Sequence, residues 1–145
     1  MNISPNAVSL ITQFEGLRLN AYKDSAGVWT IGYGHTRNVT AGQVITHEEA
    51  LTLLNEDLAE VEKAIHRRVK VTLEQYQFDA LASFIFNLGE THFAHSTLLR
   101  KLNQHDMEGA AKEFDRWVYA RRKKLAGLVR RRAAERRLFE GNVSA

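Results

Sequence analysis

The chain has 145 residues, of which 44% are apolar and 26% are charged, and its net charge at pH 7 is +3. This length and composition predict a single globular domain over residues 1–145 with one hydrophobic core. Cysteine is absent, which excludes a disulfide scaffold and any thiolate metal site and favours folding in a reducing compartment.

The start of the chain carries no secretory signal. Residues 1–16 lack both a basic segment and a long apolar run, and no stretch approaches the roughly 18 apolar residues that a membrane span needs. We therefore expect a cytoplasmic protein. If its substrate lies outside the membrane, another component must carry the protein across.

A first helix is predicted to begin after Ser4 and to end at Glu15. Ser4 is a favourable N-cap, Pro5 suits the first helical position, and Gly16 is a typical stop signal. Glu15 therefore lies in the last helical turn. One apolar stripe predicts the buried face of this helix, with members Ala7, Val8, Leu10, Ile11 and Phe14.

A small β-hairpin is predicted next. Residues 19–22 and 28–33 are rich in strand-forming side chains, and the turn residues 24–27, Asp-Ser-Ala-Gly, separate them. Gly42 and its polar neighbours predict a loop before the following helix.

Two capping-box patterns predict two longer helices. Thr46 with Glu49 begins a helix over residues 48–67, and Thr72 with Gln75 begins another over residues 73–88. The second helix is the most apolar segment and is predicted to be the central core helix. Shorter helices are predicted over residues 96–102, 106–114 and 128–139.

These elements predict an α+β architecture of two lobes. A small N-terminal β-hairpin lobe and a helical C-terminal lobe would be joined by the long helix over residues 48–67, with a cleft between the lobes. The sequence contains no internal repeat, low-complexity tract or linker.

Three polar residues around the predicted hairpin are candidates for chemistry. The carboxyl end of a helix disfavours an ionised carboxylate, so Glu15 could carry the proton that a general acid needs, although a nearby Arg would offset this effect. Asp24 in the turn could stay ionised and activate water, and the hydroxyl of Thr30, across the hairpin, could hold that water. Singly, each has an ordinary explanation: a solvated helix end, a turn Asp and a strand Thr.

Together these residues resemble a known signature. Glu15-Gly16, Asp24 nine residues after Glu15, Thr30 and the run Ile-Gly-Tyr-Gly-His at residues 31–35 resemble the catalytic segment of phage-type lysozymes, the muramidases of glycoside hydrolase family 24. The resemblance extends over almost the whole chain. Further landmarks are Ile45-Thr46, Glu49-Ala50, residues 55–58, 78–81, 86–89 and 96–102, and Leu-Val-Arg-Arg-Arg-Ala-Ala-Glu-Arg at residues 128–136.

The resemblance implies a lysozyme-like fold and roles for five residues. Glu15 would be the proton donor, Asp24 the base and Thr30 the residue that positions water. Thr36 and Phe86 would line the substrate groove, although a Phe on this helix is more often a core residue.

The resemblance also implies an activity and a setting. The protein would be a bacteriolytic endolysin that hydrolyses the β-1,4 bond between N-acetylmuramic acid and N-acetylglucosamine in peptidoglycan, as a monomer and without cofactor or metal. It would accumulate in the cytoplasm of the host bacterium and reach the cell wall after a holin opens the inner membrane.

His35 has a structural and a catalytic interpretation. As a base it would compete with Asp24, whereas the resemblance implies an ion pair with Asp57 that ties the hairpin to the long helix. The six histidines lack the spacing of a metal site, and Gly32-x-Gly34 alone is not a dinucleotide fingerprint.

The C-terminal segment is strongly basic. Residues 116–137 contain ten Arg or Lys and one Glu, a local net charge of +9, so the rest of the chain carries −6. Such a segment is either a solvated helix face or a surface for an anionic cell-wall or outer-membrane polymer. The ten cations are Arg116, Arg121, Arg122, Lys123, Lys124, Arg130, Arg131, Arg132, Arg136 and Arg137.

Two other functional classes fit parts of the sequence. A nucleic-acid-binding protein could use the basic segment, but only Trp117 and Tyr119 add aromatic character there and no recognition motif is present, so no nucleic-acid partner is expected. A lytic transglycosylase would cut the same bond without water, and would not need Asp24 and Thr30. Residues 120–127 depart from the glycine-containing pattern of many relatives, which leaves the conformation of this loop open.

Overall fold

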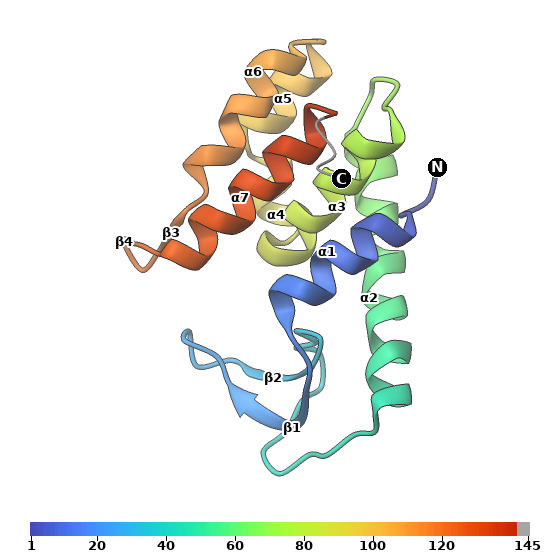
Figure 1. The fold of residues 1–145 in the computed structure, drawn as a ribbon, viewed down its shortest axis with the longest axis vertical. Coiled ribbons are helices and arrows are strands. Elements are labelled where there is room, and N and C mark those ends of the chain that lie inside the picture. Colours follow the sequence, from blue (N-terminus) through green and yellow to red (C-terminus); the bar gives the residue numbers. More distant parts are fainter. Residues whose placement is uncertain (142–145) are drawn as a thin grey trace.

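The structure is a computed structural model that describes residues 1–141. Figure 1 shows a β-hairpin lobe beside a larger helical lobe, with α2 running along one side of both, and this confirms the predicted α+β architecture. The elements in order are α1 (Pro5–Glu15), β1 (Arg18–Lys23), β2 (Trp29–Gly32), α2 (His47–Arg68), α3 (Gln75–Leu88), α4 (Glu90–Ala94), α5 (Thr97–Asn103), α6 (Met107–Glu113), the 3-10 helix η1 (Phe114–Arg116), β3 (Tyr119–Ala120), β4 (Lys123–Lys124) and α7 (Ala126–Phe139).

Helix α1 begins and ends where the sequence predicts. Pro5 is its first residue, and Gly16 follows Glu15 and donates its N–H to the Thr12 carbonyl at 2.9 Å. Ser4 stands at the N-cap position, but its hydroxyl does not cap the helix. It donates instead to buried Asp79 of α3, which fastens the start of α1 to the core.

Strands β1 and β2 form an antiparallel hairpin. Tyr22 pairs with Thr30 and Lys23 pairs with Trp29, while an irregularity follows Arg18. Beyond β2 the chain turns back on itself, so that the N–H groups of Ile31 and His35 each donate to the other residue's carbonyl at 2.9 Å. This return brings residues 34–37 towards the helices.

Helix α2 connects the two lobes. Its N-terminus has the predicted capping box: Thr46 Oγ1 accepts from the Glu49 N–H at 3.1 Å, and Glu49 Oε1 accepts from the Thr46 N–H at 3.0 Å. Its first half packs on Ile31 and Ile45 of the hairpin lobe, and its second half packs into the helical lobe.

Helix α3 is the centre of the helical lobe, as predicted. Every residue from Phe78 to Ile85 is buried, and α1, α2 and α7 pack around it. The predicted start was wrong, because Glu74, not Thr72, caps the helix, with Gln77 completing the capping box at 2.8 Å. Val71 and Leu73 pack against the core before the helix begins, and this packing keeps the chain non-helical through residue 73.

The last third of the chain holds one unexpected element. Ser96 and Asp106 cap α5 and α6 as predicted, through bonds of 3.1 and 2.9 Å to the N–H groups of Leu99 and Gly109. Residues 119–124 form a tight hairpin of β3 and β4, which answers the open question of this loop, and α7 begins two residues before the predicted start. Arg121 and Arg122 at its turn have φ angles of +52° and +66°.

Candidate active site

Glu15 lies at the carboxyl end of α1, where the chain leaves the helical lobe for the hairpin. Its side chain is 18% exposed, and its Oε2 accepts a hydrogen bond of 2.6 Å from Nη1 of Arg131. The Glu15 carboxyl thus lies between the partial negative charge of a helix end and the positive charge of a guanidinium.

Gly34 closes the site on the side of the hairpin. A Cβ atom at this position would lie 2.5 Å from Glu15 Oε1, and the φ angle of Gly34 is +78°, which side chains with a Cβ rarely adopt. Glycine is therefore the residue that lets the hairpin backbone approach the Glu15 carboxyl this closely.

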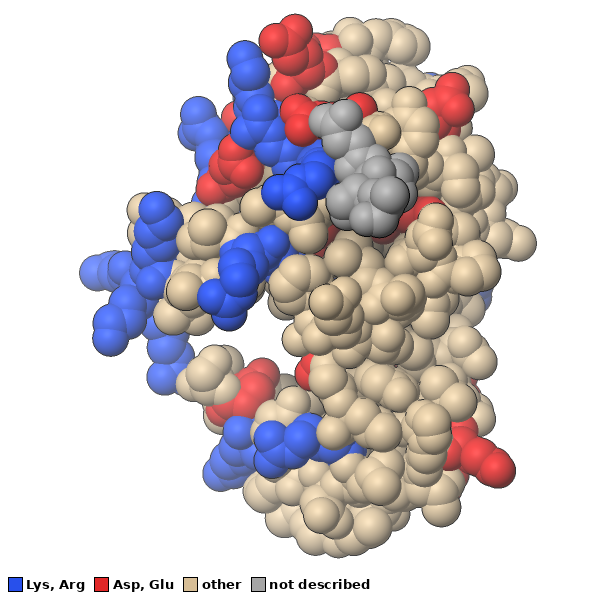
Figure 2. Space-filling view, in the orientation of Figure 1, with Lys and Arg blue, Asp and Glu red and all other residues tan. Residues whose placement is uncertain are grey.

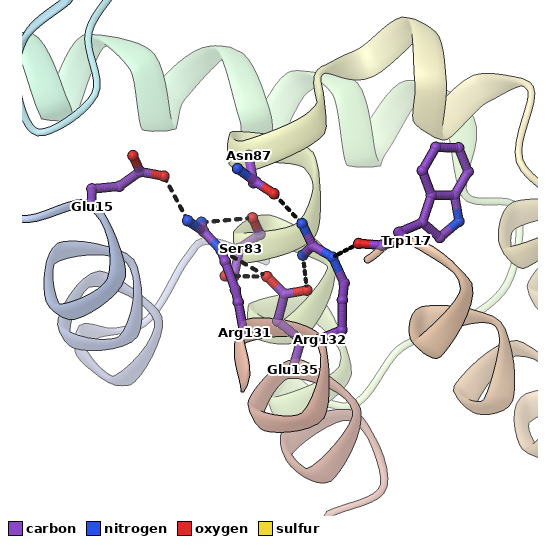
Figure 3. A network of polar contacts seen from close by, with 7 residues as sticks. All are labelled: Glu15, Ser83, Asn87, Trp117, Arg131, Arg132 and Glu135. Atoms are coloured by element: carbon purple, nitrogen blue, oxygen red, sulfur yellow. Dashed lines mark hydrogen bonds and ion pairs between the residues drawn. The ribbon is translucent and has the colours of Figure 1, made fainter. Parts of the chain in front are cut away.

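Arg131 is held by three acceptors on three elements. Besides Glu15 on α1, its Nη2 donates to the Ser83 carbonyl of α3 at 3.1 Å, and its Nε donates to Glu135 of α7 at 3.2 Å (Figure 3). The sequence predicted that an Arg near Glu15 could offset the helix end, but Arg131 was named only in the basic segment and in the family landmark at residues 128–136, so its contact with Glu15 was not predicted. The spacing of Arg131 and Glu135, four apart on a helix, was the available signal.

Arg132 and Glu135 lie deeper in the same network. Both are completely buried; Arg132 is paired with Glu135 and Asn87, and it donates from Nε to the Trp117 carbonyl at 2.9 Å (Figure 3). Burial lowers the pKa of Arg132 from its ordinary value, and the charge of Glu135 opposes this shift. The network thus contains two guanidinium and two carboxylate groups.

The predicted basic face is smaller than the sequence suggests. Arg131 and Arg132 point inward, and Arg136 pairs with Asp115 and with Glu140. Figure 2 shows Lys and Arg gathered along the edge of the helical lobe that carries β3, β4 and α7. The exposed members of the predicted set are Arg116, Arg121, Arg122, Lys123, Lys124, Arg130 and Arg137.

Asp24 follows β1 directly and forms the hairpin turn. Its Oδ1 accepts hydrogen bonds from the N–H groups of Ala26 at 2.8 Å and Val28 at 2.9 Å. Both bonds fix the side chain through one oxygen, and the residue is half-buried at the end of the hairpin lobe.

Thr30 lies two residue pairs further along the hairpin than predicted. It pairs with Tyr22 rather than standing across from Asp24, because the turn is closed by the backbone bond between Asp24 and Val28. Thr30 is 4% exposed, and its hydroxyl donates to the Val28 carbonyl at 2.9 Å.

Two cavities flank the contact between Glu15 and Gly34. One, of about 310 Å³, is lined by Gly34, Thr36 and Phe86 among others, and it separates the loop after β2 from α2 and α3. The other, of about 700 Å³, is lined by Glu15, the start of α7 and Asn87. Thr36 is exposed and Phe86 is half-buried, so both predicted groove residues present surface to the first cavity.

His35 and Asp57 form the predicted pair between the hairpin and α2. Their Nδ1 and Oδ2 atoms are 2.8 Å apart, and the other ring nitrogen of His35 lies 2.9 Å from the Arg37 carbonyl. His35 is 7% exposed, which fits a structural link better than a base acting on substrate.

Residues 1–141 hold no arrangement that suggests a metal centre. No group of three or more His, Asp or Glu side chains is placed to hold a metal ion there. Among the helices of this part, none combines the length and apolarity needed to cross a membrane.

Comparison with known proteins shows that the chain is similar to phage lysozymes. The family model described as phage lysozyme matches residues 12–135. An endolysin of Acyrthosiphon pisum secondary endosymbiont phage 1 is 49% identical over 97% of this chain and 99% of its own, and an endolysin of Salmonella phage P22 is 46% identical over 96% and 98%. A solved structure of a point mutant of P22 lysozyme superposes with a TM-score of 0.82 at 44% identity, covering 97% of this chain and 99% of that one.

Proposed function

The chain belongs to the phage lysozyme family, and on this premise we propose that Glu15, Asp24 and Thr30 carry out hydrolysis in the cleft between the lobes. The family makes the chain a muramidase, a glycoside hydrolase that degrades peptidoglycan by cutting the β-1,4 bond between N-acetylmuramic acid and N-acetylglucosamine. It is of the endolysin type, whose usual role is lysis of the bacterial host.

Glu15 is the proposed general acid, and its position carries the proposal. Its carboxyl lines the cavity at the start of α7, with Arg131 bound to Oε2 and the Gly34 backbone close to Oε1. From there it would protonate the glycosidic oxygen as the bond to the sugar breaks. Removing the proton donor from such a reaction costs roughly 10²–10⁴-fold in rate.

Asp24 is the proposed base, and Thr30 the residue that helps position its water. The backbone bonds to Asp24 fall on Oδ1, so Oδ2 is the oxygen we assign to the water. Thr30 lies diagonally from Asp24 on the hairpin. An acid and a base on opposite faces of the sugar give inversion at the anomeric carbon, and their carboxyls stand about 6.5–9.5 Å apart in such enzymes.

The substrate is proposed to lie across both cavities. Thr36 and Phe86 line the cavity beyond Gly34, where a hydroxyl and an aromatic face suit the polar edges and apolar faces of a sugar ring. The peptidoglycan glycan strand would therefore bind along these two cavities, as the family resemblance implies. The reaction would need no cofactor or metal.

The substitution Glu15→Gln tests the acid. It keeps the shape of the side chain but cannot deliver a proton, so clearing of purified peptidoglycan should fall by at least about 10²-fold while the fold persists. Glu56→Gln, at an exposed position of α2, is the matched control and should lyse normally. A folded Glu15→Gln variant with more than about a tenth of wild-type activity would remove Glu15 from this role.

Product analysis tests the use of water. Mass spectrometry of the fragments should show ordinary reducing ends, and proton NMR of the first products should show inverted anomeric configuration. Fragments with 1,6-anhydromuramic ends, lighter by one water, would contradict hydrolysis and favour the transglycosylase.

We also propose that the exposed cations of β3, β4 and α7 attract anionic cell-wall or outer-membrane polymers. Charges on a surface are screened beyond about 8–10 Å at physiological ionic strength, so wall binding should weaken as salt rises. Reversing Arg121 and Arg122 to Glu should lower binding and flatten this salt dependence, measured by cosedimentation with purified walls. An unchanged profile would mean that these side chains are only solvated.

The setting is part of the proposal. The chain would act as a monomer, accumulate in the cytoplasm of the host bacterium and reach the wall after a holin opens the inner membrane. Sedimentation of the purified protein tests the monomer, and lysis of host cells with and without a holin tests accumulation in the cytoplasm followed by release.

A further inference from the structure

We propose that Glu135 is a positioning residue for the reaction, because it holds Arg131 against Glu15 and balances the positive charge beside that acid. The inference rests on the proposed role of Glu15 as the general acid. Glu135 itself is completely buried in α7 and does not face substrate.

The geometry leaves Arg131 little freedom. Its Nε donates to Glu135 Oε2 at 3.2 Å and its Nη2 to the Ser83 carbonyl at 3.1 Å, which turns Nη1 towards Glu15 Oε2 at 2.6 Å. Glu135 Oε2 is itself fixed by the Ser83 hydroxyl, which donates to it at 2.5 Å. In Figure 3 these groups form one connected chain from the interior of the helical lobe to Glu15.

The charges of the network cancel. Arg131 and Arg132 carry two positive charges, and Glu15 and Glu135 carry two negative ones when both are ionised. Ser83, Asn87 and the Trp117 carbonyl add only neutral partners. Without Glu135, two guanidinium groups would act on Glu15, because a charge a few ångströms away in a buried site is weakly screened.

The other charged groups nearby do not replace Glu135. Arg130 lines the same cavity as Glu15 and adds positive charge, while Arg136 is engaged by Asp115 and by Glu140. Among the described contacts of Arg131, the carboxylates are therefore Glu15 and Glu135. Glu135 can thus supply both the orientation and the charge balance.

The substitution Glu135→Gln tests the charge. It preserves shape but leaves the network with one extra positive charge, which favours ionised Glu15 and confines the proton-donating form to lower pH. The alkaline limb of the kcat profile should move down by about one pH unit, and kcat on that limb should fall about tenfold with little change in KM. The substitution Glu135→Asp retains the charge, so it should keep the wild-type limb while lowering kcat at every pH.

Two further variants make the result interpretable. Glu140→Gln changes an exposed carboxylate directly after α7, outside the network, and should match wild type in both profile and kcat. Ser83→Ala removes one hydrogen bond to Glu135 without changing any charge, so it should fold if Glu135→Gln does not. It should lower kcat about fivefold at unchanged KM.

The outcomes separate this inference from the proposed function. If Glu135→Gln folds, loses only thermal stability and keeps both kcat and its pH limb, Glu135 is purely structural and the inference is overturned. If Glu135→Gln does not fold, wild-type kcat in Ser83→Ala overturns it. An active Glu15→Gln variant would remove the proposed function and this inference together, whereas an inactive one beside an unchanged Glu135→Gln profile would remove the inference alone.

Discussion

The Glu15 carboxyl lies beside two groups of opposite charge. The carboxyl end of α1 carries a partial negative charge, and the Arg131 guanidinium donates to Glu15 Oε2 at 2.6 Å. Arg131 donates to Glu15, to Glu135 and to the Ser83 carbonyl, so two carboxylates share its positive charge. For the proposed role of Glu15 as general acid, the balance between these contacts matters, because the carboxyl must hold a proton and then release it.

The proposed roles of Asp24 and Thr30 predict losses of activity of different size. Asp24→Asn keeps an oxygen for the backbone bonds but cannot take a proton from water, so turnover should fall by roughly 10²–10⁴-fold. Thr30→Ala should reduce turnover less, because it loosens the water without removing the base. Rates of reducing-end release measure both. A Thr30→Ala enzyme less active than Asp24→Asn would reverse the assigned roles.

A substitution at Gly34 tests the position of the Glu15 carboxyl without removing any functional group. Gly34→Ala would place its new methyl 2.5 Å from Glu15 Oε1 and push the carboxyl away, and a displacement of about 1 Å can cost about 10²-fold in activity. Gly42→Ala is the matched control, since Gly42 has a φ of +81° with no atom within 4 Å of the added Cβ. Both variants should lose similar stability, of about 1–2 kcal/mol, because both force a left-handed residue. Equal activity losses would show that backbone strain alone is responsible.

At the scale of elements, Glu90 joins the end of α2 to α4. Its Oε1 accepts from Arg67 Nη2 at 2.7 Å and its Oε2 from Arg68 Nε at 3.0 Å. The hydrogen bond from Arg67, with the help of Arg68, lowers the pKa of Glu90 to about 2. Glu90 also lines the cavity that holds Thr36 and Phe86, so this junction supports one wall of the groove.

The lowered pKa of Glu90 predicts a pH-dependent contribution to stability. A carboxyl with a depressed folded pKa stabilises the fold above its unfolded pKa near 4.5, and this is lost as the pH falls towards 2. Glu90→Gln should therefore lower Tm by about 2–4 °C at pH 7 and by much less near pH 2.5. Glu108→Gln, at a side chain that is 87% exposed, is the control and should change Tm little at pH 7. An equal loss at both pH values would exclude the ionised contact.

At the scale of the whole molecule, the lobes are connected by more than α2. His35 and Asp57 tie the loop after β2 to the middle of α2, while Ser4 ties α1 to Asp79 in α3. Asp57 of the first link lines the same cavity as Thr36, and the second link fastens the helix that ends at Glu15. The cleft is thus held from both sides.

The pair of His35 and Asp57 predicts coupled stability losses. His35→Asn and Asp57→Asn should each destabilise the protein, and the double variant should lose less than the sum, with a coupling of about 1–3 kcal/mol in urea unfolding. Turnover of His35→Asn should stay near wild type, because His35 is buried behind the cavity wall. Additive losses would show that the two side chains do not stabilise each other, and a collapse of turnover would restore His35 as a catalytic candidate.

Local signals in the sequence were sufficient for elements whose contacts are themselves local. Pro5 and Gly16 delimit α1, Thr46 with Glu49 begins α2, and Asp24 makes the hairpin turn, because these contacts join residues fewer than five positions apart. The family resemblance added roles for Glu15, Asp24 and Thr30, and these roles remain predictions. Where packing competes with a local signal, as at Thr72, the local signal was wrong.

Which arginines of the basic segment are buried and which are exposed, in contrast, depends on the tertiary structure. Arg131 meets Glu15 across 116 positions of the chain, and the spacing of Glu135 from Arg131 and Arg132 predicts neither this contact nor the burial of the two arginines. A run of arginines looks uniformly basic because charge is a property of the residue. Whether a guanidinium is solvated, or buried beside an acid, depends on which side of α7 packs on α3, and the long-range fold fixes this choice.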